Sequence, residues 1–134
     1  MENHTVTAKI KWLDRTILAG AHLTLVTSQK QFEAVLKQKA LESDEPYVRE
    51  GWQACTHTWK QPKYGAVLCV VAIDPEMFAS FDPIDAAALL VHEATHVWQR
   101  TRETIGDKIC DETEAYAIQN ICAQLFTAYR ETLK

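Results

Sequence analysis

The chain has 134 residues, a length that suits a single domain over residues 1–134 with one hydrophobic core. Hydrophobic residues make up 47% of the sequence and charged residues 24%, which is the balance of a folded protein rather than a disordered one. The 14 lysines and arginines are outnumbered by 18 aspartates and glutamates, so a net charge of −4 argues against a nucleic-acid partner.

Three elements are predicted in the first third of the chain. Apolar side chains recur at roughly helical spacing over residues 10–19, which predicts a helix. Residues 22–27 alternate and are rich in leucine, threonine and valine, as in a short strand. Ser28 and Gln31 then form a capping-box pattern, which predicts a helix over about residues 29–41.

The middle of the chain predicts an antiparallel hairpin. Residues 52–59 alternate loosely, and a Gln-Pro-Lys-Tyr-Gly turn signal follows them. Residues 66–73 form a continuous apolar run rich in valine, which is typical of a buried strand. The sheet is therefore expected to be small and antiparallel.

Two long helices are predicted in the C-terminal part. Asp82 and Pro83 are a strong start signal, because aspartate caps a helix and proline suits its first position, so the first helix should run to about Thr104. The second should begin near residues 107–111 and continue to about Thr132, with apolar residues at i, i+3, i+4 and i+7 spacing. An α+β fold follows from this order of elements.

No membrane segment or export signal is predicted. The longest apolar runs are far shorter than a membrane span, and the first seven residues contain no apolar signal region. We therefore expect a cytoplasmic location and no membrane partner. The four cysteines are too widely spaced for a C-x-x-C metal site and are expected to be reduced thiols: Cys55, Cys69, Cys110 and Cys122.

A His-Glu-Ala-Thr-His motif lies inside the first long helix, with His92 and His96 four residues apart. Residues at this spacing share one helix face, so both imidazoles can bind one metal ion. Glu93 is displaced by about 100° from His92, where its carboxylate can take a proton from a metal-bound water. Two neutral nitrogens and a base are what a catalytic Zn²⁺ site requires. The motif therefore predicts that His92 and His96 bind zinc and that Glu93 is catalytic.

A catalytic zinc ion needs a third protein ligand. The longer pattern H-E-x-x-H-x-x-G-x-x-H does not supply it, because Gln99 and Arg102 occupy the glycine and histidine positions. A distant histidine or a carboxylate of the next helix remains: Asp111, Glu112 or Glu114. Glu114 lies within about 40–50° of the centre of the apolar face, and Glu112 about 110° away. Because a carboxylate on an apolar face is costly unless a cation meets it, we predict Glu114 as third ligand and Glu112 as the alternative.

Other side chains have weaker claims to a role. Tyr116 could donate a hydrogen bond to a developing oxyanion. A purely structural role, with its ring packed between the helices, explains its position at least as well. Gln99 and Glu103 continue the histidine stripe and could support the ligands, although a solvated stripe is favoured. His57 could line a pocket, although a histidine without a role is favoured, and Trp98 is expected to pack between helices.

The two C-terminal motifs resemble a known family. His-Glu-Ala-Thr-His-Val-Trp-Gln, followed by Glu-x-Glu-Ala-Tyr-x-Ile-Gln, is similar to the zincin metallopeptidases with a glutamate third ligand, and in particular to small metallopeptidases of tailed bacteriophages and prophages. The resemblance covers roughly residues 83–130. It implies a minimal zincin-like domain, zinc held by His92, His96 and the helix glutamate, and Glu93 as general base. It also implies a bacterial host cytoplasm, and a peptide substrate extended along a sheet edge near the hairpin strand 66–73.

Three functional hypotheses follow. The first is a zinc-dependent peptidase acting on a peptide or protein, in which Glu93 serves as general base. The second is a metal-binding zincin-like regulatory or interaction module without peptidase activity, in which the protein would fill the fourth coordination position. The third and weakest is a zincin-like fold without a metal. An intact Glu93 favours the enzyme, because a structural metal site has no need of a base.

Overall fold

The sheet of this protein has three strands. The computed structural model describes residues 8–13, 21–61, 66–105 and 110–134. The strands are β1 (Ala21–Val26), β2 (Ala54–Gln61) and β3 (Ala66–Ile73), in the order β1-β3-β2. β2 and β3 pair antiparallel, which confirms the predicted hairpin; its turn lies outside the described residues. β1 pairs parallel with β3, so the expectation of a wholly antiparallel sheet is wrong. A helix follows β1 in the chain, as is usual where a long crossover connects parallel strands.

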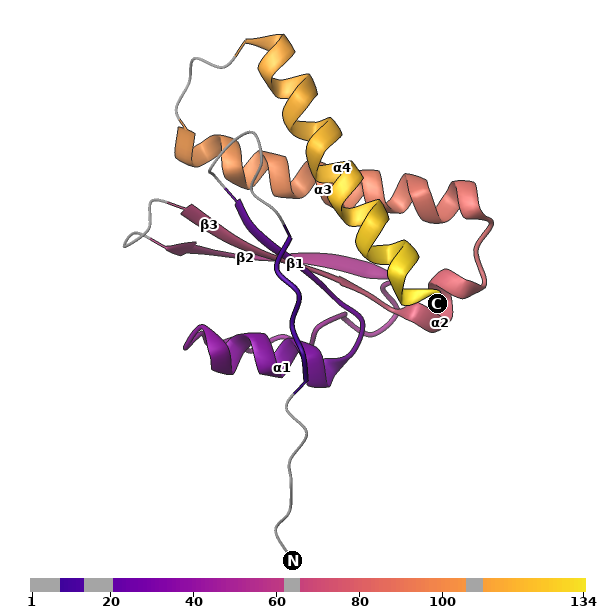
Figure 1. The fold of residues 1–134 in the computed structure, drawn as a ribbon. Helices are drawn as coiled ribbons and strands as arrows, with labels where there is room; N and C mark the ends of the chain where they lie inside the picture. Colours follow the sequence, from indigo (N-terminus) through magenta and orange to yellow (C-terminus); the bar gives the residue numbers. More distant parts are fainter. Residues whose placement is uncertain (1–7, 14–20, 62–65, 106–109) are drawn as a thin grey trace, which may run out of the picture.

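Helices cover both faces of the sheet (Figure 1). α1 (Gln29–Gln38) lies on one face, and α3 (Pro83–Ile105) and α4 (Asp111–Thr132) lie on the other. These three helices confirm the α+β prediction and its two long C-terminal helices. α2 (Pro75–Ala79) is a short helix that the sequence reasoning missed. Within the part of the chain that the structure describes, no helix is long and apolar enough to cross a membrane.

β3 contributes to two hydrophobic cores, because its side chains alternate between the faces of the sheet. One set packs with α3 and α4, and the other packs with α1. The first set is Val67, Cys69, Val71 and Ile73; the second is Leu68, Val70 and Ala72. Burial on both faces explains why this strand reads as a continuous apolar run. It also makes β3 the rigid centre on which the neighbouring helices rest.

Side-chain caps fix where two predicted helices begin. The Ser28 hydroxyl accepts a hydrogen bond from the Gln31 backbone N–H at 3.1 Å, at the start of α1. Asp82 Oδ1 accepts from the Ile84 backbone N–H at 2.8 Å, at the start of α3. Such caps satisfy N–H groups that have no partner inside the helix. Each cap thereby fixes the first turn of its helix.

The helix predicted over residues 10–19 is wrong in its described part. Trp12 forms an isolated antiparallel bridge with Thr24, and the Leu13 backbone N–H donates to the Leu23 carbonyl at 2.9 Å. β1 is an edge strand, so its outer backbone groups are open to such pairing. Pairing with this edge replaces the local helical preference. The remainder of the predicted helix lies outside the described residues.

Candidate metal centre

His92 and His96 lie on an exposed face of α3, with their Nε2 atoms 3.2 Å apart. Two nitrogens that bind one zinc ion at about 2.0–2.1 Å, with a tetrahedral angle between them, lie about 3.3–3.4 Å apart. The observed spacing therefore fits a pair of imidazoles that share a metal ion. It follows directly from the four-residue separation on a regular helix.

Gln99 sets which nitrogen of His96 carries the proton. Nδ1 of His96 lies 3.0 Å from Oε1 of Gln99. An amide oxygen only accepts hydrogen bonds, so Nδ1 donates, and Nε2 of a neutral His96 presents its lone pair toward His92. Histidines that bind metals are commonly oriented by a hydrogen bond of this kind. Gln99 thus contacts a predicted ligand, whereas Glu103, the next residue of the stripe, pairs with Arg100 at 2.8 Å.

Glu93 is buried between α3 and β2, with 3% of its surface exposed. Its Oε2 accepts a hydrogen bond from the Thr56 hydroxyl at 2.5 Å. Burying a carboxylate without a partner is costly, and Thr56 supplies one such partner. The bond also fixes the orientation of the carboxylate relative to the strand.

A cavity of about 590 Å³ brings His92, Glu93 and His96 together. α3 forms one wall and β2 forms another, where Thr56 is one of the lining residues. The segment before β2 forms a third wall that includes Trp52. Because the strand order is β1-β3-β2, β2 is the edge strand beside the motif. The prediction of a substrate-binding edge near residues 66–73 is wrong, because that strand is the central one.

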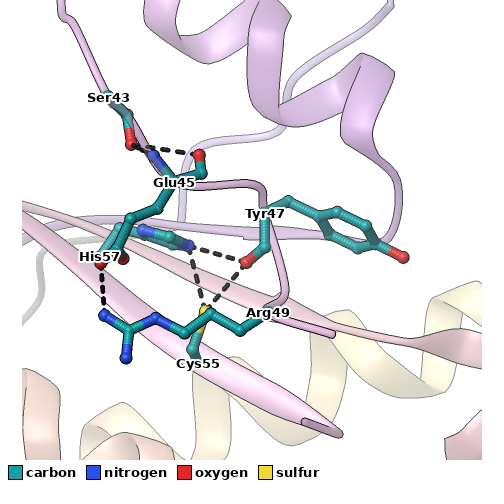
Figure 2. Close-up of polar contacts among 6 residues, drawn as sticks. All are labelled: Ser43, Glu45, Tyr47, Arg49, Cys55 and His57. Carbon is teal, nitrogen blue, oxygen red and sulfur yellow. Dashed lines mark hydrogen bonds and ion pairs between the residues drawn. The ribbon is translucent and has the colours of Figure 1, made fainter. Parts of the chain in front are cut away.

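The segment 39–53, which joins α1 to β2, is anchored through the carbonyl of Tyr47 (Figure 2). His57 Nε2 donates to this oxygen at 2.7 Å, and the Cys55 thiol donates to it at 2.9 Å. His57 is itself buried, with its ring centre 4.5 Å from that of Phe32 on α1. His57 therefore has a definite place: it lines the cavity and holds the segment that forms the third wall.

The thiol of Cys55 stays protonated at neutral pH. Burial, and to a lesser extent the nearby carboxylates of Glu93 and Glu45, raises the pKa of Cys55 from the usual 9.0 to about 11. A protonated thiol can donate to the Tyr47 carbonyl and is a poor nucleophile. Cys55 thus lines the cavity and helps to hold the segment 39–53 through the Tyr47 carbonyl.

Glu114 lies apart from the histidine pair. Its Oε2 accepts a hydrogen bond from Trp98 Nε1 at 2.9 Å, and Arg102 Nη1 lies 3.7 Å away. Trp98 follows His96 by two residues, so it leaves α3 about 160° away from His96 around the helix axis. Among the residues that the structure describes, no three histidine, cysteine, aspartate or glutamate side chains are placed to hold a metal ion. Two of the three predicted ligands are therefore together.

The remaining candidates lie on the helices. Trp98 is buried between α3 and α4, which confirms the expected packing. Glu112 is exposed in the first turn of α4. Tyr116 is 51% exposed on α4 and is not among the described residues that line the cavity.

Sequence reasoning missed the contacts that cross between elements. Nothing in the sequence identified Thr56 as the partner of Glu93, although the alternation in β2 places it on one face with Ala54 and Thr58. Nothing identified the Trp98–Glu114 bond either.

No family model, curated protein or solved structure matches the chain.

Proposed function

We propose that this chain is a zinc-dependent peptidase in which His92 and His96 hold the metal ion and Glu93 is the general base. The observation that carries the proposal is the 3.2 Å spacing of the two Nε2 atoms, in a cavity that Glu93 also lines. The similarity of the helix motif to that of the zincin metallopeptidases supports the same assignment.

The two histidines fit a zinc ion, whereas Glu114 would have to exchange partners to become the third ligand. Its present hydrogen bond from the Trp98 indole has a carboxylate as acceptor and contributes about 1.5–3 kcal/mol. Binding of zinc to a complete protein site contributes about 10 kcal/mol or more. Zinc binding therefore outweighs the Trp98 bond in free energy, but Glu114 would also have to move from the side of α3 that carries Trp98 to the side that carries the histidine pair. Glu112, one half-turn earlier on α4, is the alternative ligand.

In the proposed reaction, His92 and His96 would hold the zinc ion, which would supply the acidity of the attacking water and the polarisation of the peptide carbonyl. Glu93 accepts the proton from the attacking water and delivers it to the departing amine. Thr56 holds Oε2 of Glu93, so the carboxylate keeps a fixed orientation while Oε1 exchanges the proton. An extended peptide can pair with the outer edge of β2, which would lay its carbonyls beside the histidine pair.

The test is metal content and turnover of wild type, Glu93→Gln and His96→Ala, with a mixed peptide pool as substrate. We expect about one zinc per chain in wild type and much less in His96→Ala, because a catalytic site depends on each of its protein ligands. Glu93→Gln should keep its zinc but lose at least about a hundredfold in turnover, since it lacks the base.

Substantial turnover by Glu93→Gln would contradict the mechanism, and absence of zinc from zinc-supplied wild type would contradict the metal site. A wild-type protein that holds zinc without cutting any peptide would instead favour a metal-binding regulatory or interaction module.

A further inference from the structure

One arginine of the cavity is placed to select a substrate. Arg100 follows His96 by four residues, so the two share a face of α3 and lie about 6 Å apart along its axis. Arg100 also lines the cavity that contains His92, Glu93 and His96. We infer that Arg100 binds a carboxylate of the substrate and makes the enzyme selective for acidic peptides. This inference rests on the proposed peptidase function.

The second arginine of the cavity is already engaged within its own wall. Arg49 forms an ion pair with Glu45, which also lines the cavity (Figure 2). The Arg49 guanidinium also lies 4.8 Å from the ring centre of Trp52, a cation–π contact. Arg49 therefore has both an acidic and an aromatic partner on the same segment, and it is less available to a ligand.

Among the contacts of the described residues, Arg100 has an acidic partner but no aromatic one. Glu103 lies 2.8 Å away, and the two side chains are 45% and 44% exposed, much like those of the Arg49–Glu45 pair. Exposed ion pairs of this kind contribute little to stability, so a substrate carboxylate can replace Glu103 at low cost. Arg100 also lines a second depression, together with Gln99, Arg102 and Glu103. A guanidinium can bind a carboxylate through two parallel hydrogen bonds.

The position of Arg100 limits where the acidic group can be. An extended peptide advances by about 3.3 Å per residue, so a peptide that runs along α3 covers the 6 Å of helix axis from His96 to Arg100 in about two residues. The carboxylate can come from an aspartate or glutamate side chain, or from the free C-terminus of the peptide. Both sources present the same group to the guanidinium, at about two residues from the bond that is cut.

The experiment uses a scan set of alanine-rich hexapeptides that contain one phenylalanine. A single glutamate is moved through the other positions, and each peptide has a glutamine twin. Every peptide is made both as a C-terminal amide and as a free acid, so that side-chain and terminal carboxylates are distinguished. Cleavage by the zinc-loaded protein is followed by mass spectrometry, and binding to the metal-free protein by fluorescence polarisation of labelled copies.

We expect wild type to prefer one acidic form over its neutral twin by about tenfold, the effect of one charge-assisted hydrogen-bonded pair. Arg100→Gln should abolish this preference, and Arg100→Lys should retain part of it. Arg130→Gln, which removes a charge from the far end of α4, is the matched control and should behave as wild type. Thermal unfolding of each variant checks that it is folded.

Equal use of acidic and neutral peptides by an active wild type would overturn the inference and leave the peptidase proposal intact. So would an acidic preference that survives in Arg100→Gln. If no peptide is cut, the binding measurement decides: an acidic preference that depends on Arg100 supports the site, and its absence overturns it.

Discussion

Thr56 on β2 and Glu93 on α3 are joined by a hydrogen bond of 2.5 Å between the threonine hydroxyl and the carboxylate Oε2. The bond ties the edge strand to the helix that carries His92 and His96. It therefore holds the proposed base, the histidine pair and the strand edge in one fixed arrangement, which a catalytic site needs in order to position its substrate.

Replacement of Thr56 by valine should lower the free energy of unfolding by about 1–3 kcal/mol, because a buried carboxylate loses a hydrogen-bond partner. In the Glu93→Gln background the same replacement should cost less, since a neutral amide is less costly to leave unpaired. Urea unfolding of the four proteins measures the difference. Thr58→Val, two residues along the same strand, is the control and should change stability by at most about 0.5 kcal/mol. Equal effects at the two threonines would contradict the assigned role of Thr56.

Zinc binding should change the fluorescence of Trp98 if Glu114 leaves the indole to bind the metal ion. We expect a zinc-dependent change in tryptophan emission in wild type that is smaller in Trp98→Phe, in which Trp52 of the cavity wall can still respond. That variant should bind zinc at least as tightly, because Glu114 no longer has to break a hydrogen bond. Glu114→Ala should weaken zinc binding by at least about tenfold, as loss of a ligand carboxylate would.

Wild-type affinity in Glu114→Ala would remove Glu114 from the site. A parallel loss in Glu112→Ala would then identify Glu112 as the ligand.

The wall of the cavity should loosen when His57 is replaced by phenylalanine. The new ring can still pack beside Phe32, but it cannot donate to the carbonyl of Tyr47. We expect faster hydrogen exchange over residues 45–53 and unchanged exchange in α3, measured by mass spectrometry. Cys55→Ala removes the weaker thiol donor and should have a smaller effect. Unchanged exchange in His57→Phe would mean that this bond does not hold the segment.

Stability should fall in alkaline solution because of Cys69. Burial raises the pKa of this fully buried thiol from 9.0 to about 12, so the folded protein keeps the proton that the unfolded chain loses. The contribution of Cys69 is complete below about pH 9 and is lost progressively as the pH rises toward 12. Cys55, with its pKa near 11, acts in the same direction.

Melting temperatures between pH 8 and pH 11 should therefore fall less steeply in Cys69→Ala than in wild type. Cys110→Ala removes an exposed thiol whose pKa a hydrogen bond with Thr113 lowers, so it should not make the fall less steep and serves as the control. An identical slope in wild type and Cys69→Ala would contradict the effect.

The elements that could be predicted are those that local sequence determines. α3 was predicted because Asp82 and Pro83 mark its start, and β3 because a strand buried on both faces needs an unbroken apolar run. The helix predicted at residue 10 failed because Trp12 and Leu13 pair with the edge of β1, an interaction that local spacing cannot reveal. α2 was missed because its start signal, Asp74 before Pro75, also suits the end of a strand.

In the candidate site, too, the features that local sequence determines could be predicted, and those that depend on contacts between helices could not. The pairing of His92 with His96 is a property of one helix, so the sequence predicted it, and their Nε2 spacing agrees. The position of Glu114 depends on how α4 crosses α3, which the angular position of a residue on its own helix does not define. The angular position of Glu114 on α4 predicted that its side chain faces α3, and it does contact α3. Its partner there, however, is Trp98.

The strand arrangement also orders the events of folding. β2 and β3 are neighbours in the chain and can pair after closing a short loop, whereas β1 joins β3 only after residues 27–65 have been enclosed. Loop closure of that length carries a larger entropic cost, so the hairpin should form first and β1 should dock later. Substitutions in the hairpin should then slow folding, while those at Leu23 should mainly speed unfolding. The strand that supports Glu93 would thus exist before the sheet is complete.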